Sequence, residues 1–136
     1  MSKRLVHRRV GGIAVAVTRQ VKVGLATRNI ATASGDQAIT GVGFQPTDIE
    51  IICHVGTAGM NSEGFSDGTT ERGRFTTGAA ATTFDIDSKI INMRVDGTNI
   101  ATGIIGSFDS DGFTITWVKS NSPTGTAQIL YRATKS

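Results

Sequence analysis

Cys53 and His54 are adjacent residues whose types could form a nucleophile and its general base. They lie in segment 49–55, which has the apolar character of a strand. Because successive side chains of a strand point to opposite faces, the thiol and the imidazole cannot form the hydrogen bond that activates a cysteine. Cys53 shares its face with Ile51 and Val55, so we predict that it is a small core residue.

Carboxylates gather in two short segments. Residues 109–112 (Asp-Ser-Asp-Gly) have the composition of the start of a calcium-binding loop. Such a loop ends with a glutamate at its twelfth position, where this sequence has Ser120 after a strand-like segment. We therefore predict a hairpin turn rather than a cation site. Asp85 and Asp87 lie two apart and are expected to protect an exposed sheet edge.

The other patterns that could indicate catalysis are incomplete. His7 and His54 have no cysteines at zinc-ligand spacing. Residues 41–46 lack the third glycine of a phosphate-binding loop and lead into a strand-like segment rather than a helix. With so few histidines, no Ser/His/Asp set can be assembled. We therefore expect no catalytic residue, no metal site and no cofactor, so the chain is predicted not to be an enzyme.

The composition favours strands. The 136 residues include 14 Ile, 10 Val and 19 Thr but only 3 Leu and 3 Glu, and branching at Cβ suits a pleated sheet. The chain is long enough for one core, and it has neither a transmembrane apolar stretch nor the apolar segment of a signal peptide. A single cysteine excludes an intrachain disulfide. Asp-Gly pairs at 67–68, 96–97 and 111–112 suit tight hairpin turns.

Eight segments after residue 33 have strand character, and turn-like residues separate them. The eight strand-like segments are residues 37–42, 49–55, 72–77, 82–86, 89–95, 100–108, 113–119 and 126–133. Residues 56–67 are predicted as the longest loop and residues 78–81 as a flexible connection. The predicted fold is all-β: an antiparallel, jelly-roll-like β-sandwich of about eight strands with an extended N-terminal arm.

Alternation within the predicted strands identifies their buried faces. Phe113, Ile115 and Trp117 share one face, which favours a core position for the tryptophan over a sugar-stacking one. Ile129 and Tyr131 share a face in the last strand. The predicted core residues are Phe44, Ile51, Cys53, Phe113, Ile115, Trp117 and Tyr131.

The charge is divided unevenly along the chain. Residues 1–30 contain seven basic side chains and no acid, while residues 31–136 contain seven basic side chains and all eleven acids, a net charge of −4. Residues 1–12 show no clear period. From Ile13 to Leu25 the odd positions are apolar except for Arg19, which predicts one half-buried strand or two strands that meet near Arg19.

The apolar face of this segment needs a cover, from the chain's own sheet or from a neighbouring subunit. The basic residues could neutralise phosphates, but the segment has no aromatic residue to stack on bases. We therefore favour docking on an acidic subunit over nucleic-acid binding. Residues 1–33 are assigned to a basic arm and residues 34–136 to the sandwich domain. The assigned arm residues are Lys3, Arg4, Arg8, Arg9, Ile13, Val15, Val17, Arg19, Val21 and Val23.

Four segments resemble those of a known family: residues 37–49, 64–70, 107–117 and the closing 126–133. The family comprises small β-sandwich modules in structural proteins of tailed bacteriophages and prophages. The resemblance covers about residues 36–134. The order of a Gly-Phe-x-Pro entry and a Gly-Phe-Thr-x-x-Trp strand is also similar to H-type lectin sandwiches, as an analogy of fold alone. Residues 1–33 depart from the family pattern as an added element.

The resemblance implies a non-enzymatic virion protein, made in the host cytoplasm and assembled on the capsid or tail. A capsid decoration (cement) or similar accessory subunit is the favoured role, with other virion subunits as partners and a homo-oligomer, a trimer by the phage analogy. A lectin-like receptor-binding module of a tail fibre, using loop 56–67, is the alternative. A nucleic-acid-binding accessory protein that uses the basic arm is the second alternative. No membrane partner is expected.

Overall fold

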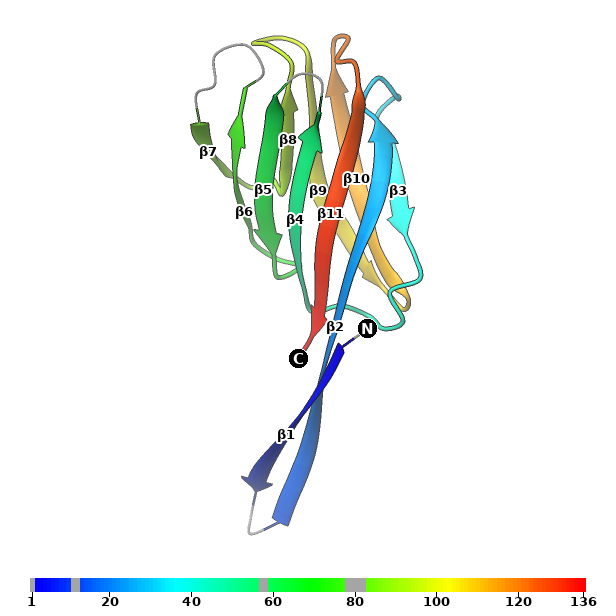
Figure 1. The fold of residues 1–136 in the computed structure, drawn as a ribbon, viewed down its shortest axis with the longest axis vertical. Helices are drawn as coiled ribbons and strands as arrows, with labels where there is room; N and C mark the ends of the chain where they lie inside the picture. The colour runs from blue at the N-terminus through cyan, green and yellow to red at the C-terminus, as the bar shows by residue number, and fades with distance from the viewer. Residues whose placement is uncertain (1, 11–12, 57–58, 78–82) are drawn as a thin grey trace.

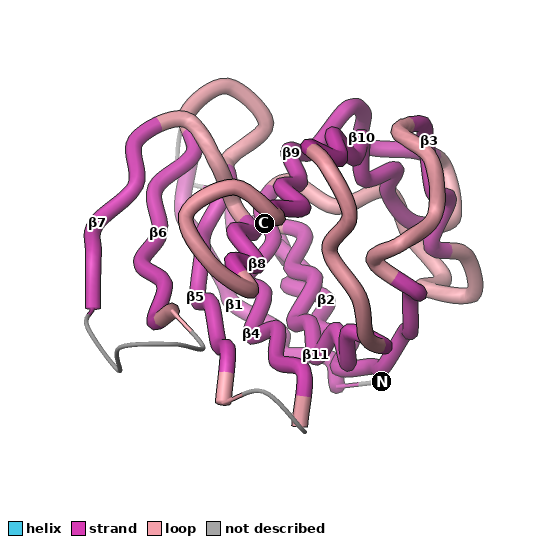
Figure 2. Tube along the Cα trace, turned by 90° about the horizontal axis from the view of Figure 1, so that it is seen from above, coloured by secondary structure: helices cyan, strands magenta, loops and turns pink. Residues whose placement is uncertain are grey.

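A computed structural model describes residues 2–10, 13–56, 59–77 and 83–136. The described residues form eleven strands and no helix. One sheet has seven strands in the order β1-β2-β11-β4-β5-β6-β7, the other has four in the order β3-β10-β9-β8, and all pairings are antiparallel. Figure 2 shows the sheets as two layers. The predicted antiparallel β-sandwich is confirmed.

The seven-stranded sheet contains β1 (Ser2–Val10), β2 (Ile13–Asn29), β4 (Asp48–Val55), β5 (Met60–Ser66), β6 (Glu71–Thr76), β7 (Thr83–Asp87) and β11 (Thr126–Lys135). The four-stranded sheet contains β3 (Gly35–Ile39), β8 (Ile91–Arg94), β9 (Ile100–Asp109) and β10 (Gly112–Ser120). Each of the eight predicted segments coincides with most of one of these strands.

The prediction of a long loop at residues 56–67 is wrong, because β5 occupies residues 60–66. The inward positions of β5 include Ser62, Gly64 and Ser66, all buried. Small residues are required there because β8 of the other sheet packs directly against β5. The Ser62 hydroxyl accepts a hydrogen bond from the backbone N–H of Asn92 at 3.0 Å. The strand was not predicted because its inward residues are small or polar and give no apolar alternation.

The N-terminal segment also differs from expectation. Residues 2–10 form a strand despite their lack of period, and of the two alternatives left open for the following segment the structure has the single strand, β2. Its residues 20–29 pair with β11 and belong to the sandwich. The arm that projects from the body is therefore shorter than the expected 1–33 segment and ends near Arg19. The predicted connection at residues 78–81 lies outside the described residues.

The core lies between the two sheets and contains all seven residues predicted for it. Phe113 and Tyr131 pack edge to face, with ring centroids 5.2 Å apart. Trp117 is buried and its Nε1–H donates to Gln37 Oε1 at 3.0 Å, while the Arg28 guanidinium lies 5.0 Å from the centroid of its ring. A buried, fully engaged indole leaves no sugar-stacking platform at this position.

The Asp-rich segment 109–112 is a hairpin turn between β9 and β10, as predicted. The Asp111 carboxylate accepts hydrogen bonds from the backbone N–H groups of Gly41 at 3.0 Å and Gly43 at 2.7 Å. Both glycines have positive φ, at 79° and 89°, which suits glycine in a tight loop. These bonds, that of Gly43 first, lower the pKa of Asp111 below its ordinary value.

We expect the substitution Asp111→Asn to destabilise the protein at pH 7, because an amide has one acceptor oxygen for two N–H groups. The lowered pKa means that the stabilisation by Asp111 is present above the unfolded pKa of about 3.9 and is lost as pH falls through the folded value. Thermal unfolding of both proteins from pH 7 to pH 2 should show a difference that shrinks below about pH 4. A difference independent of pH would contradict a role of the charge.

Candidate assembly interface

Strands β1 and β2 form a two-stranded ribbon that projects from the body (Figure 1). Nine residue pairs join them, from Ser2 opposite Val21 to Val10 opposite Ile13. On its other side β2 pairs with β11 only as far as Gln20. In the described chain, residues 13–19 therefore have no strand partner on that side, and β1 has none on its outer side. An isolated two-stranded ribbon is marginally stable in water, so this one is suited to a partner.

Nine of the ten predicted arm residues lie on this ribbon or at its junction with the body, whereas Val23 lies beyond the last β1–β2 pair and belongs to the sandwich, where it is opposite Arg132 of β11. Lys3, Arg4, Arg8 and Arg9 belong to β1. Arg19 is exposed at the junction, where β2 enters the sandwich. The ribbon thus concentrates positive charge at one end of a body that is acidic overall.

The odd positions of β2 face outward where it belongs to the sandwich. Val23 is 69% exposed and Leu25 is 61% exposed. The alternate positions face the second sheet, where a Cβ on Gly24 would overlap the Tyr131 hydroxyl and Ala26 packs against the core. A side chain at position 24 is excluded from this inward face because Tyr131 fills the space. The described chain therefore leaves these two apolar side chains uncovered.

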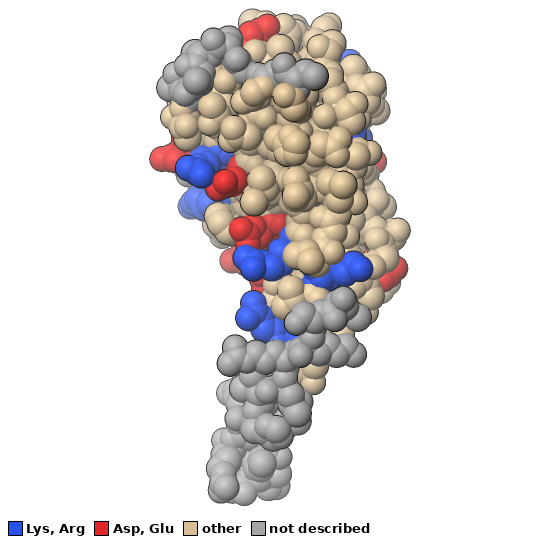
Figure 3. All heavy atoms as spheres, in the orientation of Figure 1, with Lys and Arg blue, Asp and Glu red and all other residues tan. Residues whose placement is uncertain are grey.

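Neighbouring strands extend the exposed apolar surface. Leu130 on β11 lies opposite both Leu25 on β2 and Ile52 on β4. Leu130 is 43% exposed and Ile52 is 42% exposed. We call Val23, Leu25, Ile52 and Leu130 the outer apolar patch. Figure 3 shows this face of the sheet, with its charged side chains mainly near the arm and along one side. A contiguous exposed apolar patch is typical of an interaction surface.

Ile52 and Leu130 are not among the residues predicted for an interface. A signal was present, because each interrupts strict alternation by adding an apolar residue beside core positions, in Ile51-Ile52-Cys53 and Ile129-Leu130-Tyr131. Such runs indicate a strand that is apolar on both faces.

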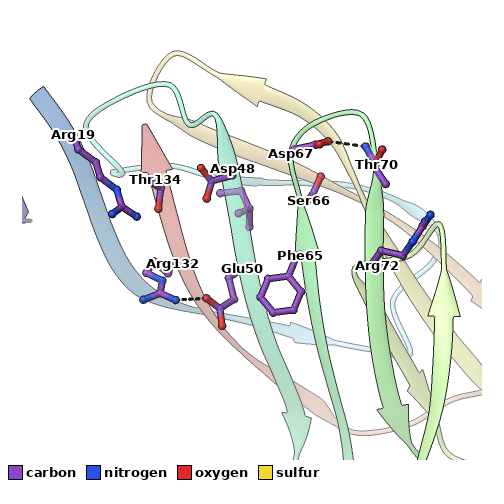
Figure 4. Close-up of a pocket in the computed structure, with 11 residues that line it drawn as sticks. Arg19, Asp48, Glu50, Phe65, Ser66, Asp67, Thr70, Arg72, Arg132 and Thr134 are labelled. Carbon is purple, nitrogen blue, oxygen red and sulfur yellow. Dashed lines mark hydrogen bonds and ion pairs between the residues drawn. The ribbon is translucent and has the colours of Figure 1, made fainter. Parts of the chain in front are cut away.

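A groove of about 370 Å³ lies between the junction and strands β4 to β6 (Figure 4). Arg132 pairs with Glu50 inside it, and Phe65 lies beside them with 56% exposure. Asp67 accepts hydrogen bonds from the backbone N–H groups of Thr69 at 2.9 Å and Thr70 at 2.7 Å, which lower its pKa. The charged lining residues are Arg19, Arg72, Arg132, Asp48, Glu50 and Asp67. Three positive and three negative groups give the groove no net charge that would select an anion.

The candidate nucleophile is enclosed in the core. Cys53 has no exposed surface, and burial raises the pKa of its thiol to about 12. His54 is half-buried and follows it on a strand whose burial alternates, so the two side chains lie on opposite faces. A buried thiol with a raised pKa is protonated at neutral pH and is a poor nucleophile. Among the described residues, no three His, Cys, Asp or Glu side chains are grouped so as to hold a metal ion.

Comparisons with protein-family models, with curated proteins and with solved structures gave no match to this chain. The part of the chain that the structure describes contains no helix long and apolar enough to span a membrane. The ribbon and the outer apolar patch are therefore the features from which a function can be argued.

Proposed function

We propose that this protein is a non-enzymatic structural subunit of a phage virion, a capsid decoration or similar accessory subunit that docks through the β1–β2 ribbon. The observation that carries the proposal is that the ribbon projects from the sandwich and that, among the described residues, the outer edge of β1 and the edge of β2 at residues 13–19 pair with no further strand. Main-chain groups on open edges add to a neighbouring sheet through regular hydrogen bonds. The placement in a virion rests on the sequence resemblance, and the docking role rests on the ribbon.

Charge supports a heterologous contact for β1. Four of its nine residues, Lys3, Arg4, Arg8 and Arg9, are basic and none is acidic. A surface with a negative potential would therefore speed its association and orient it. The outer apolar patch provides a second contact surface on the same sheet, continuous with the side from which the ribbon extends. A subunit held by a charged ribbon and an apolar face would be fixed in one orientation.

Two variants test this function in phage particles that carry the gene in its native setting. Deletion of residues 2–18 should abolish incorporation of the chain into purified particles, measured by quantitative mass spectrometry. Replacement of Lys3, Arg4, Arg8 and Arg9 by Glu keeps the strand length and should reduce incorporation roughly tenfold or more, because attraction becomes repulsion.

The control variant Lys119→Glu also reverses a charge but lies on β10, outside the ribbon, and should be incorporated like the natural chain. Normal incorporation of the deletion variant would contradict the proposal. Particles that lack the chain altogether would contradict the virion role.

Neither alternative is favoured by an observation of the fold. The loop expected to contact sugars contains strand β5 instead, and Trp117 is buried. Nucleic-acid binding by the ribbon predicts retention on heparin that falls steeply with salt and disappears when residues 2–18 are deleted. That result, together with normal particles from the deletion variant, would favour the nucleic-acid alternative.

A further inference from the structure

The two open edges of the ribbon differ in chemistry. The β1 edge has four basic residues in nine, and charged residues on an edge strand discourage pairing with a like strand. The edge of β2 that lies beyond β11 is residues 13–19, in which the segment 13–18, Ile-Ala-Val-Ala-Val-Thr, has no charged residue and Arg19 lies at the end next to the body. An uncharged edge rich in β-branched residues is the kind that pairs readily with another strand.

The position of this neutral edge limits what can occupy it. The last residue pair between β11 and β2 joins Lys135 to Gln20, so the free edge begins where β11 ends. Figure 1 shows the C-terminus at this point, beside the base of the ribbon. A strand that paired with this edge would lie in line with β11, beside the ribbon. Within the described chain, no strand lies there. A neutral edge gives an acidic partner no electrostatic advantage, whereas it is suited to its own copy.

We propose that residues 14–18 of β2 pair with the same residues of a second copy, antiparallel across a two-fold axis at Ala16. This register places Val15 opposite Val17 of the second copy and leaves the two Arg19 residues at opposite ends of the paired segment. Like charges directly opposite would be destabilising, and this register avoids them. The interface is isologous, as in most homodimers.

The resulting sheet has four strands in the order β1-β2-β2-β1. Both β1 strands lie at its outer edges, so their basic residues are separated by two strands and remain available to other partners. The bodies lie at opposite ends of the shared ribbon because the two β2 strands are antiparallel. Four strands are also more stable than the isolated ribbon. This inference rests on the proposed role of the ribbon in assembly and identifies the partner of one of its edges.

Cysteine cross-linking tests the axis directly, with a matched control on the same rung. Ala16 and His7 are opposite each other in the ribbon, on β2 and β1. In the full chain, Ala16→Cys should form a disulfide-linked dimer under mild oxidation, whereas His7→Cys should remain monomeric on a non-reducing gel. Cys53 is fully buried and does not compete. Cross-linking of His7→Cys but not Ala16→Cys would overturn the proposal.

Light scattering after size exclusion provides a second measurement. The natural chain should have twice the monomer mass of 14.3 kDa, and the dimer should persist in 0.5 M salt. Ala16→Arg places two positive charges against each other and should dissociate the dimer, with a dissociation constant raised at least tenfold, whereas His7→Arg should remain dimeric.

A natural chain that is monomeric or trimeric, or an Ala16→Arg variant that remains dimeric, would overturn the self-pairing. The docking role is judged separately, by the loss of the deletion variant from particles. A monomeric chain whose deletion variant is still lost would therefore refute the self-pairing alone.

Discussion

Deletion of residues 2–30 is expected to leave the body unfolded, whereas deletion of residues 2–18 should barely change its unfolding midpoint. The longer deletion removes all ten residue pairs between β2 and β11. It also removes Ile30, which is 1% exposed, and loss of such a buried side chain alone costs about 2–5 kcal/mol. A domain of this size is stable by only about 5–15 kcal/mol, so the combined loss should exceed its stability.

The shorter deletion ends before Gln20, the last β2 residue that pairs with β11. It keeps the Arg28 guanidinium over Trp117 and the Gly24 backbone beside Tyr131. Circular dichroism during thermal unfolding of both truncated proteins and of the full chain measures the difference. The 2–30 deletion variant could unfold at the same midpoint as the full chain, or the 2–18 deletion variant could show no unfolding transition. Either result would show that the boundary between ribbon and body is elsewhere.

The second large effect is expected at Gly64. A Cβ at this position would overlap the backbone carbonyl oxygen of Ile90 and would lie 2.7 Å from Ile90 Cα. Because the obstacle is backbone, no side-chain rotation relieves it, and β5 and β8 must move apart. The inner residues of this region, Ile91 and Met93, have no exposed surface, so the movement would disturb the centre of the core.

We therefore expect Gly64→Ala to lower the free energy of unfolding by about 3 kcal/mol or more, at the upper end of the range for overpacked cores. Urea denaturation of the variant measures the loss. Gly97→Ala is the matched control, because nothing lies within 4 Å of a Cβ there. Equal midpoints for the two variants would mean that β5 and β8 are not in the close contact that the structure describes.

The predictable part of the fold rested on local signals. Phe113, Ile115 and Trp117 alternate with threonines, so the buried face of β10 could be read without its neighbours. The turn at residues 109–112 was recognisable because Asp and Gly favour tight turns. Strand β5 was missed because Ser62 and Gly64 carry no apolar signal, and their small size is explained only by the approach of β8.

The candidate interface was only partly predictable for a related reason. The charge division between residues 1–30 and the remainder is a property of composition, so it could be read without the structure. The boundary of the projecting part was not fixed by the pattern, because Arg19 interrupts the apolar positions but β2 continues through it as one strand. It is set by where β11 stops pairing, which depends on a strand more than a hundred residues away in the sequence.

The sequence by itself determined the all-β class, the core face of the last strands and the concentration of positive charge in the first 30 residues. Only the tertiary structure decided which face of β2 meets the second sheet. Alternation shows that a strand has two faces but does not assign either one to the core. Here Tyr131 occupies the space beneath Gly24, so Val23 and Leu25 face outward. That packing constraint leaves the two side chains exposed, although the apolar stripe was predicted to need a cover.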